Sequence, residues 1–443
     1  MTCPEFQGLD AYQPEPPFLL LFKEDKGKLC SQGVHYTRQS GKTCYLFLFR
    51  PDKTMLKVNT AMKTYNKSSI PTTERYQPTY PAPNICGKKW QSQYRALHED
   101  IINNKREPKF LVYTCPWSNN GCCGYGNRVY ALVSLFYLAV LTNRAFLIDW
   151  RAPRPLTLFL KPNNINWNFP VPRLETRKHY WRTGGEESKV RKGWLMRNTT
   201  AFVSWIGNEN VLNYFDKPVE IATSILFFAH YGIRKNKYLM RQARKLKLRP
   251  ILPGSRKFDM IGCAWDMLFR PTKRLQNALE ITRKALRENA AFVIGIHIRL
   301  GDQQFGRNNT RVSNFQQFFS CAKKVERKTF NHYSNTTKKK TRWFLATDNV
   351  LVKDYARKYY GKKVIMANNN PEHLDFHKKN EKHSVEGMLG VLHDHYMLAE
   401  SDYLILSESS FSNTAVGLGM HTSKTYTLGD KCDLNEDGPE LKT

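Results

Sequence analysis

The sequence predicts an α/β protein whose second half forms a doubly wound parallel sheet. Two patterns carry this prediction. A strand-like run, a glycine-rich turn and an apolar helix follow one another between 109 and 144. Four pairs of strand and helix then alternate between 292 and 420, which is typical of parallel sheets. A chain of 443 residues with 41% hydrophobic residues can also bury the cores of two or three domains.

Residues 1–85 are expected to be an irregular arm or stem, because prolines recur in them and interrupt regular elements. The apolar runs at 18–22 and 45–49 are shorter than the roughly 18 residues that span a bilayer. Neither run has the layout of a signal peptide. Membrane attachment is therefore expected only through an anchor that this chain lacks.

A first α/β domain is expected at 86–288. The strand at 109–114 leads into the turn CPWSNNGCCGYGN, and apolar residues at helical spacing predict a helix at 128–144. Both faces of that helix are apolar, so it should be buried on most sides. The strand AFLID at 145–149 completes a βαβ unit. In the mixed segment that follows, the sequence predicts helices near 220–248 and 272–288.

A second domain is expected at 289–432, followed by a tail at 433–443. Its strands and helices should alternate regularly. The expected strands are FVIGIHI, RWFLA, KVIMA and DYLILS, and the expected helices begin at Ser313, Asp348, Glu386 and Ser409.

The chain is strongly basic, with 69 Lys and Arg against 38 Asp and Glu and a formal net charge of +31. Such a surplus favours contact with polyanions, or a phosphorylated substrate, or only a well-solvated surface. The basic residues are densest at 233–249 and 338–342. The sequence contains no recognisable nucleic-acid-binding module, so no nucleic-acid partner is expected.

Ten cysteines occur without a CxxC pair and without zinc-finger spacing. Four Asn-x-Ser/Thr sites accompany them. Together they predict the Golgi or secretory lumen and some disulfides, whose pairing the sequence leaves open. The four sites begin at Asn66, Asn198, Asn308 and Asn335.

Charged and hydroxyl side chains gather where the predicted strands of the second domain end. His297, Arg299 and Asp302 follow the first strand, Asp348 follows the second, and Ser407 to Ser412 follow the fourth. Ligands of such sheets bind at these carboxyl ends. A guanidinium fits phosphate oxygens, and a helix N-terminus favours an anion. The edge is therefore predicted to bind a nucleotide diphosphate.

Each feature also has a purely structural explanation. Arg299 could be a solvated charge, Asp348 could be only a helix cap, and the serines could serve only as caps. Residues two apart on a helix point in different directions. The histidines of HDH at 393–395 are therefore expected to be structural and not a metal pair.

Four motifs in order resemble those of the GDP-fucose-dependent fucosyltransferases, over about 110–432. The motifs are GYGNR at 124–128, HIRLGD at 297–302, FLATD at 344–348 and ESDYLILSESSFSNTAVGLG at 400–419. The resemblance implies a GT-B-like fold of two facing Rossmann-like domains. The first would take the acceptor, a glycan or glycoprotein, and the second would bind GDP-fucose. It also implies inverting transfer of L-fucose without a metal or other cofactor.

The resemblance also implies residue roles. Arg299 would hold the β-phosphate, with His297 and Asp348 around the ribose and guanine. Asn127 would touch the donor or the attacking hydroxyl. The residues implied in donor binding are Gly124, Gly126, Asn127, His297, Arg299, Gly301, Asp302, Asp348, Ser409, Ser410, Phe411 and Ser412.

Two positions depart from the α1,6-type pattern. Leu300 stands where those enzymes have a second arginine, and no carboxylate lies between Asp302 and Phe315, where their catalytic glutamate is expected. Asp149, at the end of a strand in the first domain, is a candidate base. The motifs favour α1,2-type over α1,6-type transfer. Two alternatives stay open: a homologue that binds the nucleotide sugar or a glycan without turnover, and a polyanion-binding protein.

Overall fold

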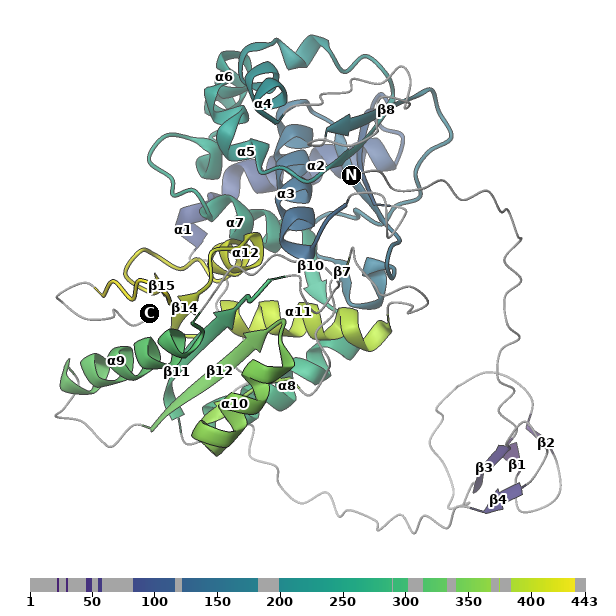
Figure 1. Cartoon of the computed structure of the whole chain (residues 1–443). Helices are drawn as coiled ribbons and strands as arrows, with labels where there is room; N and C mark the ends of the chain where they lie inside the picture. Colours follow the sequence, from purple (N-terminus) through teal and green to yellow (C-terminus); the bar gives the residue numbers. More distant parts are fainter. Residues whose placement is uncertain are drawn as a thin grey trace, which may run out of the picture. The chain divides into compact units, whose positions relative to one another are not determined.

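The structure is a computed structural model (Figure 1). It describes residues 83–115, 122–181, 199–288, 290–301, 314–332, 340–367, 374 and 384–434, and four short strands before residue 58. The chain divides into two compact units, Met1–Gln77 and Pro78–Thr443. None of the described helices has the length and apolarity needed to cross a membrane. The four predicted glycosylation sites lie outside the described residues.

The first unit contains an antiparallel sheet of four short strands in the order β2-β1-β3-β4. The expectation of an irregular arm at 1–85 therefore differs from the structure. Strands of two to five residues carry too little alternation to stand out among the prolines. The strands are β1 (Phe22–Lys23), β2 (Leu29–Cys30), β3 (Tyr45–Phe49) and β4 (Met55–Lys57).

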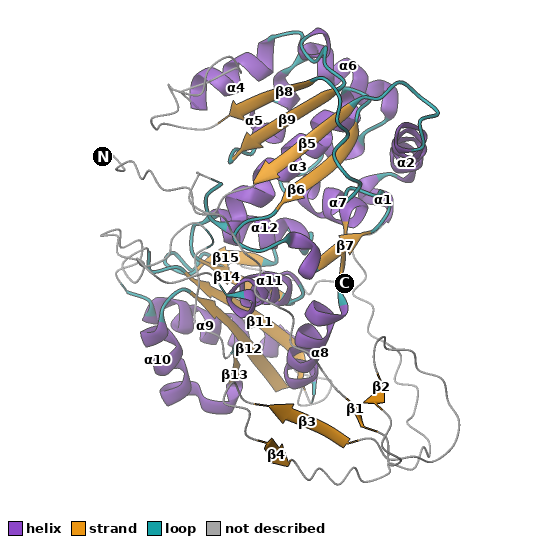
Figure 2. Cartoon of the chain, turned by 90° about the vertical axis from the view of Figure 1, so that its right-hand side faces the viewer, coloured by secondary structure: helices purple, strands orange, loops and turns teal. Residues whose placement is uncertain are grey.

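The first α/β domain of the second unit has a fully parallel four-stranded sheet (Figure 2). Its order is β6-β5-β9-β8. The sequence predicted the first two strands but not the last two, because these alternate with charged residues and β9 falls where a helix was expected. The strands are β5 (Phe110–Cys115), β6 (Ala145–Trp150), β8 (Thr176–Trp181) and β9 (Val219–Ser224).

Helix α3 (Tyr125–Leu141) packs on one face of this sheet and is buried along nearly its whole length, as predicted. Leu111 and Tyr113 of β5 share its hydrophobic core. Val112, between them, lies in a separate cluster on the other face, with Ile101 at the end of α2 (Lys88–Ile102). The remaining helices of this domain are α1 (Pro83–Cys86), α4 (Thr199–Asn208), α5 (Phe228–Tyr231), α6 (Lys237–Leu246) and α7 (Asp259–Leu268).

The second domain contains a five-stranded, fully parallel sheet in the order β13-β12-β11-β14-β15. This confirms the predicted parallel sheet. The central strand β11 alternates between two cores: Ile294 and Ile296 lie in one, Val293 in the other. The strands are β11 (Ala290–Ile298), β12 (Lys340–Thr347), β13 (Val364–Ile365), β14 (Tyr403–Leu406) and β15 (Tyr426–Leu428).

Helices cover both faces of this sheet, so the fold is doubly wound, as predicted. Phe318 and Phe319 of α9 and Val352 of α10 belong to one core, and Leu392 of α11 and Leu279 of α8 belong to the other. The helices are α8 (Lys273–Arg287), α9 (Gln316–His332), α10 (Val350–Tyr360), α11 (Val385–Ala399) and α12 (Ser410–Leu418).

Helix α8 lies with the second domain, whereas the sequence placed it in the first. Both ends of the Arg283 fork donate to the Glu400 carboxylate, at 2.7 and 2.6 Å, and Arg287 pairs with Asp402 at 2.7 Å. The domain boundary therefore precedes α8 instead of falling at 288. Strand β10 (Phe269–Pro271), directly before α8 in the chain, pairs with β7 (Leu160–Pro162) in a two-stranded antiparallel ribbon.

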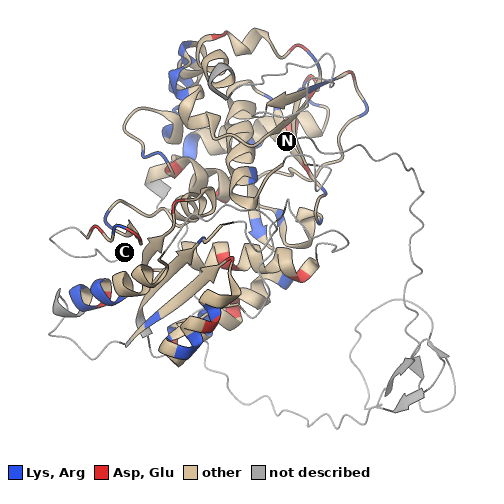
Figure 3. Cartoon of the chain, viewed as in Figure 1, with Lys and Arg blue, Asp and Glu red and all other residues tan. Residues whose placement is uncertain are grey.

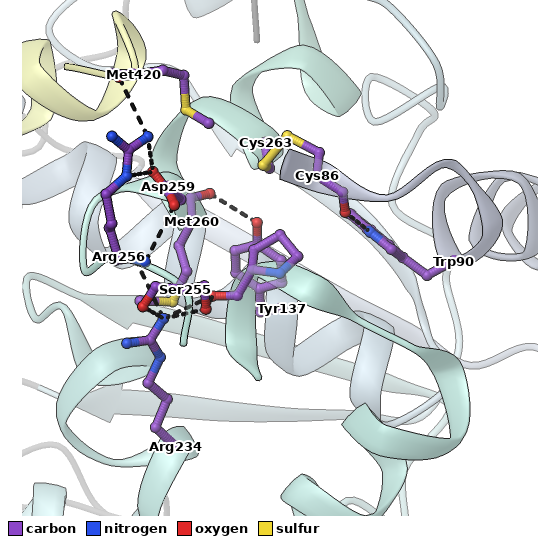
Figure 4. Close-up of a disulfide and its surroundings, with 11 residues drawn as sticks. Cys86, Trp90, Tyr137, Arg234, Ser255, Arg256, Asp259, Met260, Cys263 and Met420 are labelled. Atoms are coloured by element: carbon purple, nitrogen blue, oxygen red, sulfur yellow. Dashed lines mark hydrogen bonds and ion pairs between the residues drawn. A yellow bond between two sulfur atoms is a disulfide. The ribbon is translucent and has the colours of Figure 1, made fainter. Parts of the chain in front are cut away.

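Helix α7 joins the parts of the second unit (Figure 4). The disulfide Cys86–Cys263 ties it to α1, and the Tyr137 hydroxyl of α3 donates to Met260 O at 2.8 Å. A Cβ at Gly262 would lie 2.7 Å from Gly417 O of α12. Close packing thus connects the two α/β domains through α7. Two further disulfides, Cys115–Cys122 and Cys321–Cys432, confirm the prediction of disulfides.

Candidate active site

Two strand ends of the second domain, those of β11 and β12, meet at the Asp348 carboxylate. Arg299, directly after β11, places Nη1 2.8 Å from Asp348 Oδ2. The amides of Leu300 and Gly301 donate to the same carboxylate at 3.0 and 3.2 Å. Gly301 has a φ of +125°, a conformation that residues other than glycine rarely adopt. Asp348 therefore holds both the Arg299 guanidinium and the turn that carries it.

Asp348 does not cap the helix that follows it. Asn349 is the N-cap of α10, and its side chain accepts a hydrogen bond from the Leu351 amide at 2.8 Å. The Asp348 side chain is 8% exposed. Burial raises the pKa of Asp348, while Arg299 and the two amides lower it. The structure therefore excludes the explanation that Asp348 is only a helix cap.

The turn between β14 and α12 is bonded to the same cluster. The Arg299 amide donates to Ser407 Oγ at 2.9 Å, and the Ser407 amide donates to His297 O at 2.9 Å. Ser409 is the N-cap of α12, and its hydroxyl accepts from the Ser412 amide at 3.0 Å. The structure thus gives Ser409 the capping role. It leaves Ser410, which is half-buried, at the first position of the helix.

His297 is buried behind this turn. Its Nδ1 lies 2.7 Å from Ser412 Oγ, whose proton goes to Ser407 O at 2.6 Å, so Nδ1 is the donor. Its ring packs 5.0 Å from that of Phe411. Burial, and secondarily the positive charge of Arg299, lower the pKa of His297 to about 3. The neutral His297 thus holds Ser412 by a hydrogen bond and Phe411 by ring packing.

The glycine loop of the first domain closes directly onto α12. A Cβ at Gly126 would lie 2.4 Å from both Phe411 N and Ser410 C, so only glycine allows this approach of two backbones. The neighbouring Tyr125 ring packs 5.9 Å from Phe411. The glycine loop and the first residues of α12 are therefore in direct backbone contact.

Gly124 is the N-cap residue of α3, and Asn127 is half-buried in its first turn. Arg128 anchors the loop from inside. Its guanidinium donates to Cys123 O at 2.7 Å and to Ala152 O at 2.6 Å. It also donates to Leu374 O at 3.2 Å and lies 5.2 Å from the centre of the Trp150 ring.

The two histidines of HDH are structural, as predicted. His393 lies 2.7 Å from the Thr282 hydroxyl. His395 Nε2 lies 3.0 Å from Thr414 Oγ1, and its ring lies 5.3 Å from Phe411. Burial, followed by the nearby His297, lowers the pKa of His395 to about 3. Within the described ranges, no cluster of His, Cys, Asp and Glu could hold a metal ion.

The sequence missed the ring cluster around Phe411. His297, His395 and Tyr125 come from three separate segments and surround this one ring. Tyr125 lies 4.9 Å from His395. Tyr125 and His297 stand within motifs that the sequence indicated, but no local pattern shows that their rings meet.

The structure does not bring Asp149 to this cluster. Its neighbour Trp150 packs 6.3 Å from Tyr125, and successive side chains of a strand point to opposite faces. Asp149 therefore faces the other side of the sheet. There it pairs with Arg151 at 2.9 Å and accepts from the Thr114 hydroxyl at 3.3 Å. Asp302 lies outside the described residues.

The chain is similar to known fucosyltransferases. Residues 257–416 match the family model described as alpha-(1,6)-fucosyltransferase N- and catalytic domains. No curated protein matches the chain.

Three solved structures illustrate the structural similarity. A mutant of Arabidopsis thaliana FUT1 in complex with GDP is 18% identical, with a TM-score of 0.48 over 74% of this chain and 76% of that one. NodZ alpha-1,6-fucosyltransferase soaked with GDP-fucose is 14% identical, with a TM-score of 0.39 over 70% and 92%. POFUT1 in complex with GDP-fucose is 10% identical, with a TM-score of 0.36 over 73% and 98%.

The TM-scores of these structures are all below 0.5, so the similarity to fucosyltransferases depends on the matched segment. That segment begins just before α7 and ends within α12. It contains the HIRLGD and FLATD motifs and most of the motif at 400–419, whereas GYGNR at 124–128 lies outside it. The matched segment comprises 160 of the 443 residues, and this part of the chain is similar to the fucosyltransferase family that the model describes.

Proposed function

We propose that the chain transfers L-fucose from GDP-fucose to a hydroxyl of a glycan or glycoprotein, with inversion and without a metal. One observation carries the proposal: the Asp348 carboxylate holds Arg299 at the strand ends, beside the N-terminus of α12. This is the edge at which such sheets bind nucleotides. The match of 257–416 to a fucosyltransferase family supports fucose as the sugar.

The proposed roles follow from charge and position. Arg299 would bind the β-phosphate, because a guanidinium presents parallel donors to phosphate oxygens. The first amides of α12 would add the partial positive charge of a helix N-terminus. Asp348 would then be a positioning residue, since its carboxylate orients Arg299 and the amides of Leu300 and Gly301.

The reaction we propose moves one sugar between two oxygens. The acceptor hydroxyl oxygen attacks the anomeric carbon from the face opposite the diphosphate. The bond to the diphosphate oxygen breaks, GDP leaves with the electron pair, and the hydroxyl proton passes to solvent water. Negative charge grows on the diphosphate in the transition state, so cationic donors fixed there lower the barrier. Arg299 and α12 supply this charge without a metal in the proposed mechanism.

We propose α1,2 linkage from the single arginine of the HIRLGD motif. Leu300, in the place of a second arginine, is half-buried against the core that contains β11. A hydrophobic contact there cannot bind phosphate. The matched family is described as α1,6, so methylation analysis or NMR of the product decides the linkage. The three disulfides support a lumenal, oxidising compartment such as the Golgi.

The proposal is tested with the purified full chain. GDP should raise its melting temperature and UDP should not. Labelled GDP-fucose should then give a fucosylated product on a glycan array. A GDP effect without turnover on any acceptor, and without hydrolysis, would instead support the binding homologue that the missing carboxylate after Asp302 suggests.

The polyanion alternative rests on charge alone. Lys and Arg gather on α6, α9 and α10 (Figure 3). Helix α6, within the basic run 233–249, buries Leu239, Met240 and Ala243 and exposes basic residues on its other side. Steeply salt-dependent heparin binding by a protein that shows no GDP effect would favour this alternative over the transferase.

A further inference from the structure

A cavity of about 230 Å³ lies at the carboxyl ends of the first domain's sheet. Polar side chains from all four strands line it: Asp149, Thr114, Thr223 and Tyr180. Strand pairing sets Asp149 beside Thr114 and Tyr180 beside Thr223. Tyr113 pairs with Ala222, so the next residues of the two central strands, Thr114 and Thr223, also lie side by side. The four residues therefore form one row across the sheet.

The same face changes character along the strands. Nearer their amino ends, Phe110, Val112 and Leu147 form an apolar cluster with Ile101 of α2. At the carboxyl ends, the residues on this face are threonines, an aspartate and a tyrosine. Thr114 and Tyr180 are half-buried, and no described helix covers this end. A face built only for packing would continue the apolar pattern.

The hydroxyls and the paired carboxylate of the row suit a polyol, and the exposed side chain of Lys178 also lines the cavity. Asp149 is held by Arg151 at 2.9 Å, so the two charges offset each other while the carboxylate oxygens still accept hydrogen bonds. Thr223 donates to Thr114 O at 3.2 Å, which leaves its oxygen as an acceptor. Ile221 and Val171 add apolar surface. A few placed polar groups on an apolar wall are typical of small-molecule sites.

The volume restricts the size of the ligand. Sites for drug-sized ligands usually measure roughly 300–1,000 Å³, so a cavity of about 230 Å³ suits a smaller ligand. It corresponds to roughly seven or eight water molecules at about 30 Å³ each, which is enough for one sugar ring.

From this geometry we infer that the cavity binds one neutral pyranose ring of the acceptor glycan. That this sugar belongs to an acceptor rests on the proposed function. The cavity itself is separate from the cluster of Arg299, Asp348 and Ser407. Asp149 would accept from ring hydroxyls, and Thr114, Thr223 and Tyr180 would form the remaining hydrogen bonds. The site would thus select for the acceptor and leave donor binding to the second domain.

Two matched tryptophan variants test the inference. Val171 lines the cavity and is 36% exposed, whereas Leu174, three residues further on, is 42% exposed and does not line it. Both positions are accessible to solvent, so both variants should fold. Val171→Trp should fill the cavity, and Leu174→Trp should not.

The measurement is saturation-transfer NMR on the full chain with galactose, glucose, N-acetylglucosamine, mannose and glucuronate as separate probes. We expect at least one neutral sugar to bind, and Val171→Trp to lose at least tenfold in apparent affinity while Leu174→Trp keeps it. Thr223→Val, which removes one hydroxyl, should weaken the same sugar severalfold, as expected for one hydrogen bond.

Three results would overturn the inference. They are no binding of any neutral sugar, equal binding by both tryptophan variants, or binding of glucuronate alone. GDP-induced stabilisation is measured in parallel in all variants. If GDP fails to stabilise the native chain while a neutral sugar still binds in the cavity, the transferase proposal fails and the sugar site stands. If GDP stabilises every variant and no sugar binds, the reverse holds.

Discussion

The two parallel sheets end in edges of very different construction. In the second domain, Arg299 and Asp348 have side chains that are 16% and 8% exposed, and backbone amides complete their hydrogen bonds. In the first domain, Asp149 is 28% exposed and its partner Arg151 is 67% exposed. One edge is an interlocked, buried cluster, and the other is an open row beside a cavity.

This difference fits two kinds of chemistry. A group that must meet growing charge on a diphosphate has to be fixed before the reaction begins, so its partners are buried and numerous. A surface that only selects a sugar needs hydrogen bonds in roughly the right places, and solvent-exposed side chains suffice. The buried edge should therefore be sensitive to substitution and to pH, and the open edge should tolerate both.

The largest effect is expected from Arg299→Ala. It should lower fucose transfer by 100-fold or more, because loss of one such donor costs about 3 kcal/mol in comparable sites. The rate is measured with labelled GDP-fucose at saturating acceptor, and folding is checked by thermal unfolding.

Arg287→Ala is the matched control. It removes an arginine–aspartate pair of the same domain, with Asp402, at the amino end of the sheet. Its transfer rate should stay within about threefold of the original, even if its stability falls. If Arg299→Ala and Arg287→Ala lost the same share of transfer activity, Arg299 would contribute to stability alone. The proposed functional difference between the two sheet edges would then be wrong.

Much of the fold could be predicted from the sequence because its elements are long and regular. Helix α3 is apolar on all sides and β11 is continuously apolar, so burial shows in their composition. The strands β8 and β9 could not be found in this way. Their residues alternate between a buried core face and the polar cavity row, and charged residues interrupt both patterns. Helix α8 was found, but no local signal shows that it packs on the second domain.

The edge around Arg299 could be predicted as a set of strand ends but not as a network. Arg299, Asp348 and the serine turn each follow a recognisable strand, so topology brings them together. Whether Asp348 caps α10 depends on a single neighbouring residue. Asn349 caps this helix, so the Asp348 carboxylate can pair with Arg299 instead. The face of the sheet on which the Asp149 side chain lies depends on which face α3 covers. Only the three-dimensional packing determines this.

The second prediction concerns acid. The pKa values of His297 and His395 are lowered to about 3 from an ordinary value of about 6.5. Above pH 6.5 both are neutral in the folded and unfolded chain, and their contribution to stability is complete. As the pH falls from 6.5 toward 3, only the unfolded chain gains protons, so stability is lost. Together they should remove up to roughly 2.7 kcal/mol per pH unit in this window.

Denaturant unfolding at pH 7, 6 and 5 measures this loss. His98 and His230 of the first domain also have pKa values lowered to about 4, so they steepen the overall dependence. His395→Asn isolates the contribution of the Phe411 cluster and should reduce the slope by about 1.4 kcal/mol per pH unit. An unchanged slope in that variant would mean that His395 already gains a proton in the folded state.

A smaller effect is expected from Gly126→Ala. The new methyl group would meet the backbone of Ser410 and Phe411 at 2.4 Å, and such overpacking costs about 1–3 kcal/mol. We expect kcat/KM for GDP-fucose to fall roughly 10- to 100-fold, because the glycine loop must retreat from α12. Gly207→Ala in α4 is the control, since its nearest atom would be 3.6 Å away. Comparable losses in both variants would exclude a special role for the loop contact.

Asp149→Asn should have the smallest effect, and it tests both ideas about this residue. The exposed ion pair with Arg151 contributes less than about 1 kcal/mol to stability, so the variant should fold normally. If Asp149 binds acceptor hydroxyls, KM for the acceptor should rise severalfold, the effect of about one hydrogen bond, while kcat changes by less than about threefold. If it were instead the general base that the sequence suggested, kcat should fall 100-fold or more with little change in KM. Because Asp149 lies on the face of the sheet opposite Trp150 and Tyr125, we expect the change to appear in KM.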